Sequence, residues 1–242
     1  MLSAAAGRRR SVKSCRTTPT GARATSGLKR RDTVTARIDK LTTSGTFSLD
    51  GGTWDVDNNV WLIGDDQEVL VIDAAHDAAA IAAAVAGRKV VAILSTHGHD
   101  DHIDAAPQLA EITGAPILLH PADAHLWGMK HVHRQPDADL QDGQVISVAD
   151  VEGTVLHTPG HSPGAVSVYF PALGAVFTGD TLFKGGPGAT GRSFSDFPQI
   201  IESISSRLLQ LSADTVVHTG HGDDTSIGAE SPHLDEWIVR GH

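Results

Sequence analysis

The stretch Ser95–Asp104, which reads S-T-H-G-H-D-D-H-I-D, is the polar cluster around which the rest of the chain is organised. It follows the apolar run Val90–Leu94, which predicts a buried strand, so the cluster begins where that strand leaves the core. Gly98 lacks a Cβ, which permits a sharp turn between two ligands and leaves space for an ion. Imidazole and carboxylate groups without thiolate suit zinc, iron or manganese. The stretch therefore predicts a metal site rather than a solvated polar loop.

The spacing within this stretch indicates two adjacent metal positions. In an extended segment, alternate side chains point to the same side of the backbone. We therefore expect His97, His99 and Asp101 to converge on one side while His102 turns to the other. The rest of the chain must then supply the missing ligands.

Composition limits the class of protein. The chain has 242 residues, 40% of them hydrophobic, which can fill the core of one large domain or two small ones. Apolar runs are interrupted well before they reach the length of a membrane span, so we expect no transmembrane helix and no membrane partner. The single cysteine, Cys15, excludes an intrachain disulfide and fits a reducing compartment, so we expect a cytoplasmic protein. Nothing in the sequence indicates an oligomeric state.

Charge is divided unevenly along the chain. The formal net charge is −10, but residues 1–40 hold 11 of the 19 Lys and Arg and only 2 of the 29 Asp and Glu. Residues 41–242 therefore carry a formal charge of −19. A body this acidic is not expected to bind nucleic acid.

Residues 1–33 are rich in Arg, Ser, Thr, Ala and Gly without apolar periodicity, which predicts a disordered basic tail. Their composition resembles an organellar transit peptide, although the amphipathic pattern is weak, and an organellar location is the alternative to the cytoplasm. A nucleic-acid-binding arm is a second alternative. We favour a third, in which the tail is dispensable upstream sequence and residues 34–242 form the folded domain.

The folded region predicts many short strands with helices between them. In the first half we expect a hairpin at 60–64 and 68–73, a helix at 77–86, the strand at 90–94, a helix at 104–113 and a strand at 115–120. In the second half we expect strands at 145–148, 154–157, 165–170, 174–177 and 214–217, and a helix at 199–211. Residues 129–140, with His131 and His133, predict a mobile loop outside the metal site.

Three further candidate ligands each lie in a glycine-containing turn just after a predicted strand. They are His161 in T-P-G-H-S-P-G, Asp180 in T-G-D-T and His221 in H-T-G-H-G-D. Each alone is weak evidence, because a single His or Asp after a strand is more often a structural or turn residue. A sheet-based fold can bring strand ends to one edge, where these three residues would complete two metal sites.

These motifs resemble those of the metallo-β-lactamase fold hydrolases, and within them the small glyoxalase II-like thioester hydrolases. The matching segments are T-H-G-H-D-D-H at 96–102, T-P-G-H-S-P-G at 158–164, F-T-G-D-T-L-F at 177–183, T-G-H-G-D-D-T at 219–225 and V-I-D-A at 71–74. The resemblance implies an α/β fold, a four-layer αβ/βα sandwich with a two-metal site at one edge.

The resemblance also implies a role for each candidate. His97, His99 and His161 would bind one ion, Asp101, His102 and His221 the other, and Asp180 would bridge them. Asp73 would not bind an ion itself but would support the loop that carries the ligands. The cofactors would be two divalent ions, with zinc preferred and iron or manganese as alternatives.

Two departures narrow the implied activity. Typical β-lactamases of this fold carry Cys in place of Asp180 and lack a counterpart of His102, so antibiotic hydrolysis is not expected as the main task. Only 21 residues follow His221, too few for the helical domain that holds the thiol carrier in two-domain glyoxalase II.

We therefore expect a hydroxyacylglutathione hydrolase-like enzyme that cleaves a thioester of a small-molecule thiol. Two metal ions make water nucleophilic near pH 7 and polarise the carbonyl, while Asp101 orients or deprotonates the water. The main alternative is an iron-dependent persulfide dioxygenase of the same fold, which needs two His and one carboxylate. A non-catalytic metal module is a third interpretation.

Overall fold

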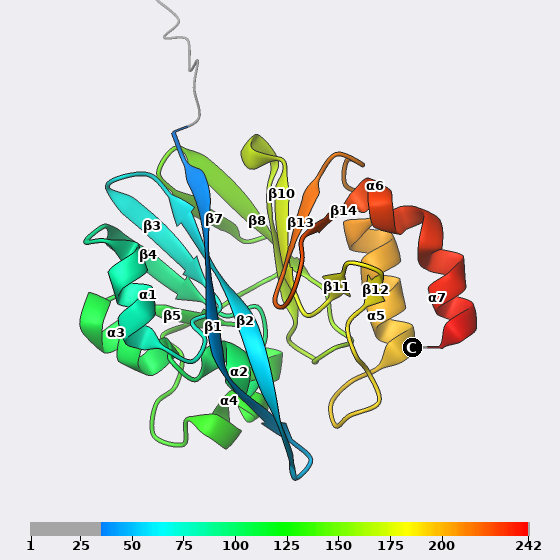
Figure 1. Cartoon of the computed structure of the whole chain (residues 1–242), viewed down its shortest axis with the longest axis horizontal. Helices are drawn as coiled ribbons and strands as arrows, with labels where there is room; N and C mark the ends of the chain where they lie inside the picture. Colours follow the sequence, from blue (N-terminus) through cyan, green and yellow to red (C-terminus); the bar gives the residue numbers. More distant parts are fainter. Residues whose placement is uncertain (1–34, 242) are drawn as a thin grey trace, which may run out of the picture. The chain divides into compact units, whose positions relative to one another are not determined.

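The computed structural model describes residues 35–241 (Figure 1). The predicted tail at 1–33 lies outside the described residues, so its disorder and dispensability stay predictions. Within residues 35–241, no helix combines the length and the apolar character needed to cross a membrane.

The described residues form two six-stranded mixed sheets. The first has the order β1 (Arg37–Leu49), β2 (Gly52–Gly64), β3 (Glu68–Ile72), β4 (Lys89–Leu94), β5 (Ile117–Leu119), β6 (Ala138–Asp139). The second has the order β14 (Thr225–Ser226), β13 (Val216–Thr219), β10 (Ala175–Gly179), β9 (Val166–Phe170), β8 (Val151–His157), β7 (Val145–Val148). A separate ribbon pairs β11 (Leu182–Phe183) with β12 (Gly186–Pro187).

Helices lie outside both sheets, α1 and α3 beside the first and α5 and α7 beside the second (Figure 1). They are α1 (Ala78–Val85), α2 (Asp100–Ile103), α3 (Ala106–Thr113), α4 (Ala124–Lys130), α5 (Phe197–Ser203), α6 (Ile227–Glu230) and α7 (Leu234–Arg240). Short 3₁₀ turns span Pro121–Asp123, Pro171–Leu173 and Ser231–His233, and a π-helical segment at Ile204–Leu208 continues α5.

Three apolar layers hold this arrangement together. Val69 and Val71 of β3 pack with residues of α1 and α3, whereas Leu70 and Ile72 face the second sheet. A third layer, which includes Val176 of β10, packs against α5 and α7. Strands buried on both faces are apolar at every position, which explains the continuous runs in the sequence. The predicted four-layer αβ/βα sandwich is confirmed.

The helix predicted at 104–113 is wrong at its start. Residues 100–103 form a separate short helix, α2, and α3 begins anew at Ala106 with Pro107 in its first turn, where proline is well tolerated. Asp101 and His102 therefore lie on a helical turn rather than in the extended segment that alternation predicted.

The mobile loop predicted at 129–140 is also wrong in part. The helix α4 continues to Lys130, with Leu126 and Trp127 buried, and the two-residue strand β6 extends the first sheet. Both elements are too short to show a periodicity in the sequence.

In the second half, Ile200, Ile204 and Leu208 are fully buried, which confirms the apolar helical face, although the helical segment ends at 208 rather than 211. The last predicted strand begins later than expected, at Val216, and includes His218.

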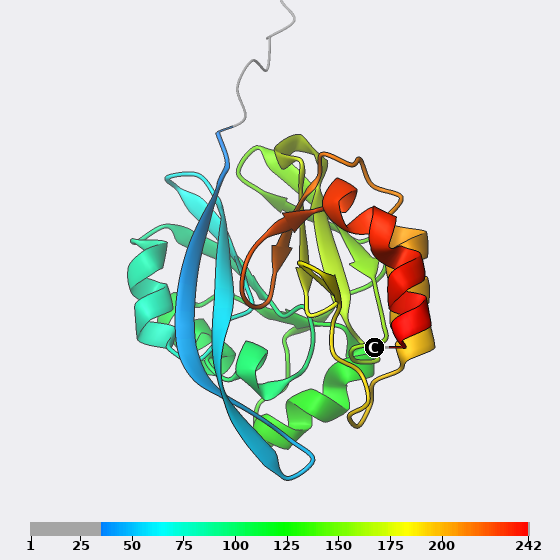
Figure 2. The same cartoon turned by 45° about the vertical axis from the view of Figure 1, so that its right-hand side comes forward.

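A long hairpin was missed by the sequence analysis. Strands β1 and β2 pair from Arg37↔Gly64 to Leu49↔Gly52, and Asp50 and Gly51 at the tip both have positive φ, as a tight Asp-Gly turn requires. Figures 1 and 2 both show the tip of this hairpin extending beyond the other strands of the first sheet, near the loop that follows β12. The hairpin thereby forms a wall for the site described next.

Candidate metal centre

The candidate ligands lie at one edge of the two sheets, after the carboxyl ends of the strands that carry them. The strand β4 leads into His97 and His99, β8 leads toward His161, and the parallel strands β10 and β13 lead to Asp180 and His221. In sheets of this kind, sites form beyond the carboxyl ends of the strands. The structure thus places the candidates that follow strand ends close to one another.

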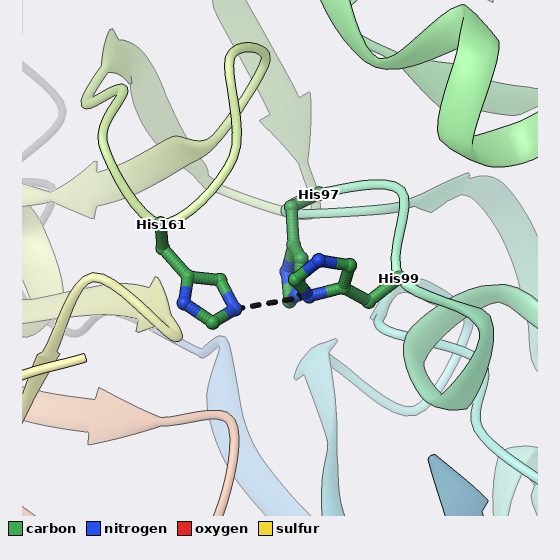
Figure 3. Close-up of side chains that lie close together, drawn as sticks. All are labelled: His97, His99 and His161. Carbon is green, nitrogen blue, oxygen red and sulfur yellow. Dashed lines mark hydrogen bonds between the residues drawn. The ribbon is translucent and has the colours of Figure 1, made fainter. Parts of the chain in front are cut away.

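His97, His99 and His161 point toward one another (Figure 3). The Nε2 atoms of His97 and His161 each lie 3.0 Å from Nδ1 of His99. Ligand nitrogens about 2.0–2.1 Å from a tetrahedral zinc ion would lie roughly 3.3 Å apart. The three rings are therefore spaced for one ion.

A second group joins Asp101, His102 and His221. The Nε2 atoms of His102 and His221 are 3.2 Å apart, and Oδ2 of Asp101 lies 3.3 Å from Nε2 of His221. His102 thus lies in this second group, and Asp101 lies there too, although alternation predicted that Asp101 would converge with His97 and His99.

Asp180 lies between the two groups. Its Oδ1 is 3.4 Å from Nε2 of His102, and its Oδ2 is 3.4 Å from Nε2 of His221 and 3.6 Å from Nε2 of His161. One carboxylate therefore reaches both sets of nitrogens, which is the position that a bridging ligand needs. The structure brings all seven predicted ligands together.

The donor set fits divalent cations. In the described part of the chain, Oδ1 of Asp101 and Oδ1 of Asp180 are buried and accept no hydrogen bond. Buried carboxylate oxygens without a partner are unfavourable unless a cation satisfies them. Burial keeps the pKa of His97 well below its usual value and lowers the pKa of His99 to about 3, so both imidazoles are neutral, as ligands must be.

Two histidines hold protons in place of the cations. Burial disfavours the charged form of His221, but the carboxylates of Asp180 and Asp101 outweigh it and raise its pKa to about 10. The pKa of His102 is likewise raised well above its usual value by Asp101, Asp180 and Asp73 despite burial. Conversely, His102 and His221 outweigh burial to lower the pKa of Asp101 to about 2.

Zinc binding to the metal-free protein is therefore expected to release protons at pH 7. An imidazolium cannot ligate, so His102 and His221 must lose their protons. Because the pKa of His221 is raised to about 10 and that of His102 well above its usual value in the metal-free protein, the apparent affinity should rise as the pH increases from 7 toward 10. Calorimetry in two buffers of different ionisation enthalpy measures the protons released. Equal heats in both buffers would contradict these assignments.

The ring nitrogens that face away from the cluster are held by the protein. Nδ1 of His102 lies 2.9 Å from Oδ2 of Asp73, and the ring N–H groups of His161 and His221 can donate to the carbonyl oxygens of Ala189 and Asp57 at 2.8 and 2.7 Å. Such contacts fix the ring orientation and leave Nε2 to face the ion.

Asp73 occupies the supporting position that the resemblance implied. The Thr96 backbone N–H and hydroxyl donate to its two oxygens at 2.7 and 2.8 Å, and the Thr96 hydroxyl lies 3.1 Å from Nδ1 of His97. One buried carboxylate therefore contacts His102 directly and His97 through Thr96.

Asn58 is a site residue that sequence reasoning missed. Its Nδ2 donates to Oδ2 of Asp101 at 3.0 Å, and its Oδ1 lies 2.8 Å from Nε2 of His76. Asn is depleted in strands, so the pair Asn58-Asn59 within β2 was the available signal. His131 and His133, which were predicted to lie outside the site, belong to neither ligand group.

A cavity of about 260 Å³ opens beside the cluster. Its floor includes His99, Asp101, His161, Asp180 and His221, and its walls are Phe47, Trp54 and Val56 of the hairpin and Ala189, Arg192, Ser193 and Ser195 of the loop after β12. The walls touch, because the Arg192 guanidinium lies 3.9 Å from the Trp54 ring centroid and the Ser193 backbone N–H donates to Asp50. The cluster is therefore open to a small molecule on one side.

The sequence matches the family model of the metallo-beta-lactamase superfamily over residues 53–221, and the chain belongs to this superfamily of generally hydrolytic metalloenzymes. Hydroxyacylglutathione hydrolase GloC of Haemophilus influenzae is 35% identical over 151 residues, which cover 57% of this chain and 71% of GloC.

Two solved structures are similar in fold and sequence. The TTHA1623 protein in a di-iron-bound form has a TM-score of 0.66 and 32% identity, with 73% of this chain and 93% of that chain covered. The BLEG-1 B3 metallo-beta-lactamase has a TM-score of 0.68 and 28% identity, with 79% and 98% covered. The predicted family is confirmed, and the prediction that antibiotics are not the main substrate stays a prediction.

Proposed function

We propose that the protein hydrolyses a thioester of a small-molecule thiol with two divalent metal ions at the His/Asp cluster. The observation that carries this proposal is the position of Asp180, whose two oxygens reach both ligand groups at the floor of an open cavity. The similarity to a hydroxyacylglutathione hydrolase supports the substrate class. We propose zinc as the metal, with iron or manganese as alternatives, and the di-iron form of TTHA1623 favours testing iron directly.

The residues present fit this chemistry. When bound, two such ions supply a nucleophile from water at neutral pH and polarise the substrate carbonyl. Asp101 lines the cavity and, with a pKa of about 2, is ionised at neutral pH, so it can accept a hydrogen bond from the attacking water and hold it in line. The departing thiolate has a parent pKa of about 8.5 and leaves without a general acid.

Arg192→Ala is expected to raise KM about 2- to 5-fold while kcat changes little. The guanidinium stacks on Trp54 and completes the cavity wall, but it is not one of the seven ligands. A cation–π contact at an exposed position contributes about 0.5–1 kcal/mol, and loss of binding to substrate and transition state alike appears in KM. Steady-state kinetics measure both constants.

Arg207→Ala is the matched control, because Arg207 pairs with Asp142 and does not line the cavity. An unchanged KM in Arg192→Ala, or an equal change in both variants, would mean that the substrate does not use this wall.

A persulfide dioxygenase is the second candidate. One specific observation favours it, since His97, His102 and Asp180 form a group of two imidazoles and one carboxylate, the ligand set of many non-haem iron oxygenases. Metal-free protein loaded with zinc or, without oxygen, with iron separates the two proposals. Thioester hydrolysis without oxygen uptake supports the hydrolase, and persulfide-dependent oxygen uptake by the iron form supports the dioxygenase.

A further inference from the structure

Asp123 is a fully buried carboxylate that the function described so far leaves without a role. It ends the 3₁₀ turn before α4 and its side chain accepts three short hydrogen bonds. Its Oδ2 accepts from the Gly98 backbone N–H at 2.8 Å and from the Ser162 hydroxyl at 2.6 Å. Its Oδ1 accepts from the Gly164 backbone N–H at 2.6 Å. Burial of an acid is unfavourable unless such donors compensate, so the three bonds are what keep it there.

These three donors belong to two different ligand loops. Gly98 lies between His97 and His99, and Ser162 directly follows His161. One side chain therefore joins the two segments that supply the three histidines of Figure 3. The two segments are more than 60 residues apart in sequence, yet they come into contact, because Nε2 of His161 lies 3.0 Å from Nδ1 of His99.

The glycines of both loops are explained by the same contact. A Cβ added at Gly98 would lie 3.0 Å from Cβ of Asp123, and a Cβ added at Gly164 would lie 2.7 Å from its Cγ. Separations this short force a neighbour to move, so Asp123 packs directly against the backbone of both loops. The space at Gly98 is thus filled by Asp123 and Leu126, which corrects the expectation that it accommodates an ion.

We infer that Asp123 is the positioning residue for one of the two ion positions, because it sets the separation between His97 and His99 on one loop and His161 on the other. This inference rests on the two-ion site of the proposed function, but not on the substrate. The other group has its own support, since Asp101 accepts a hydrogen bond from Asn58 of β2, and Asn58 is not one of the three donors to Asp123. Outer residues that orient ligands typically affect metal affinity 10- to 100-fold.

The test is zinc titration of metal-free full-length protein, with elemental analysis after desalting and chelator competition for the affinity of each ion. Wild type should bind two ions per chain. Asp123→Asn keeps the size of the side chain but replaces one acceptor oxygen by a donor. We expect it to weaken one ion about 10- to 100-fold and to leave the other within about 3-fold. Asn58→Ala, as the matched comparison, should weaken an ion as well, but through the other group.

Two backgrounds identify which ion is affected. In a His161→Ala background the Asp123→Asn change should have almost no further effect on the affinity for the remaining ion. In a His221→Ala background it should still lower the affinity for the remaining ion about 10-fold or more. A residue that only stabilises the fold would act equally in both. Ser162→Ala removes a single donor and should weaken the same ion by a smaller factor. This variant provides the test if Asp123→Asn does not fold.

Unchanged affinity for both ions in Asp123→Asn and Ser162→Ala, or an equal loss in the two backgrounds, would overturn the inference. Wild type that binds fewer than two ions would instead overturn the two-ion site, and the role of Asp123 with it. The two failures can therefore be distinguished, because the first is measured on the variants and the second on wild type.

Discussion

Replacing Asp180 with alanine is expected to lower thioester turnover about 100-fold or more, which corresponds to about 3 kcal/mol in the activation barrier. The reason is that one carboxylate lies 3.4–3.6 Å from nitrogens of His102, His161 and His221, so its loss weakens both ion positions at once. We expect the bound metal to fall from two ions per chain toward one. Turnover and elemental analysis on the same samples measure both effects.

The fold should survive this change. Asp180 pairs with His102 and His221 in the metal-free protein, but without it these imidazoles can lose their protons, so no unpaired charge is left behind. Zinc should raise the melting temperature of the variant less than that of wild type. Asp235→Ala, at an exposed carboxylate on α7, is the control and should match wild type. Full metal content with near-normal turnover in Asp180→Ala would show that the bridging position is misassigned.

Asp73→Ala is expected to have the second largest effect, this time on both stability and metal affinity. Three donors, two from Thr96 and one from His102, would lose a buried acceptor, and each such loss costs about 1–3 kcal/mol. We expect the free energy of unfolding of the metal-free protein to fall by about 3–5 kcal/mol and zinc affinity to fall roughly 10- to 100-fold. Denaturant unfolding and zinc titration measure the two quantities.

Asp73→Asn is the matched milder variant. Asp73 has φ of 57°, a left-handed conformation that Asn tolerates better than Ala, and the amide retains one acceptor oxygen. It should therefore lose clearly less stability than Asp73→Ala while its affinity for zinc still falls. Equal stability of the two variants would show that neither the backbone conformation nor the remaining acceptor matters at this position.

The candidate ligands could be predicted from the sequence because each follows an apolar strand within a few residues. His161, Asp180 and His221 are far apart in sequence, yet strands that run in one direction deliver their carboxyl ends to one edge. The central strands could be located because they are buried on both faces and are therefore continuous apolar runs, as Val69–Ile72 shows.

Other features were hidden because they depend on contacts that no local pattern records. Asp101 and His102 share a helical turn that begins at Asp100, which alternation could not reveal. Asn58 and Asp123 reach the ligand loops from distant segments, and Gly98 is explained only once Asp123 is seen against it. The hairpin of β1 and β2 was missed although its Asp50-Gly51 turn was an available signal.

A stepwise zinc titration of the metal-free protein, with thioester hydrolysis followed at each step, tests the two-metal hydrolase most sharply. We expect saturation at two ions per chain, turnover that becomes maximal only as the second ion binds, and no oxygen uptake by the same samples. Saturation at a single ion with full activity, or a fully loaded protein that consumes oxygen and leaves thioesters intact, would contradict this expectation.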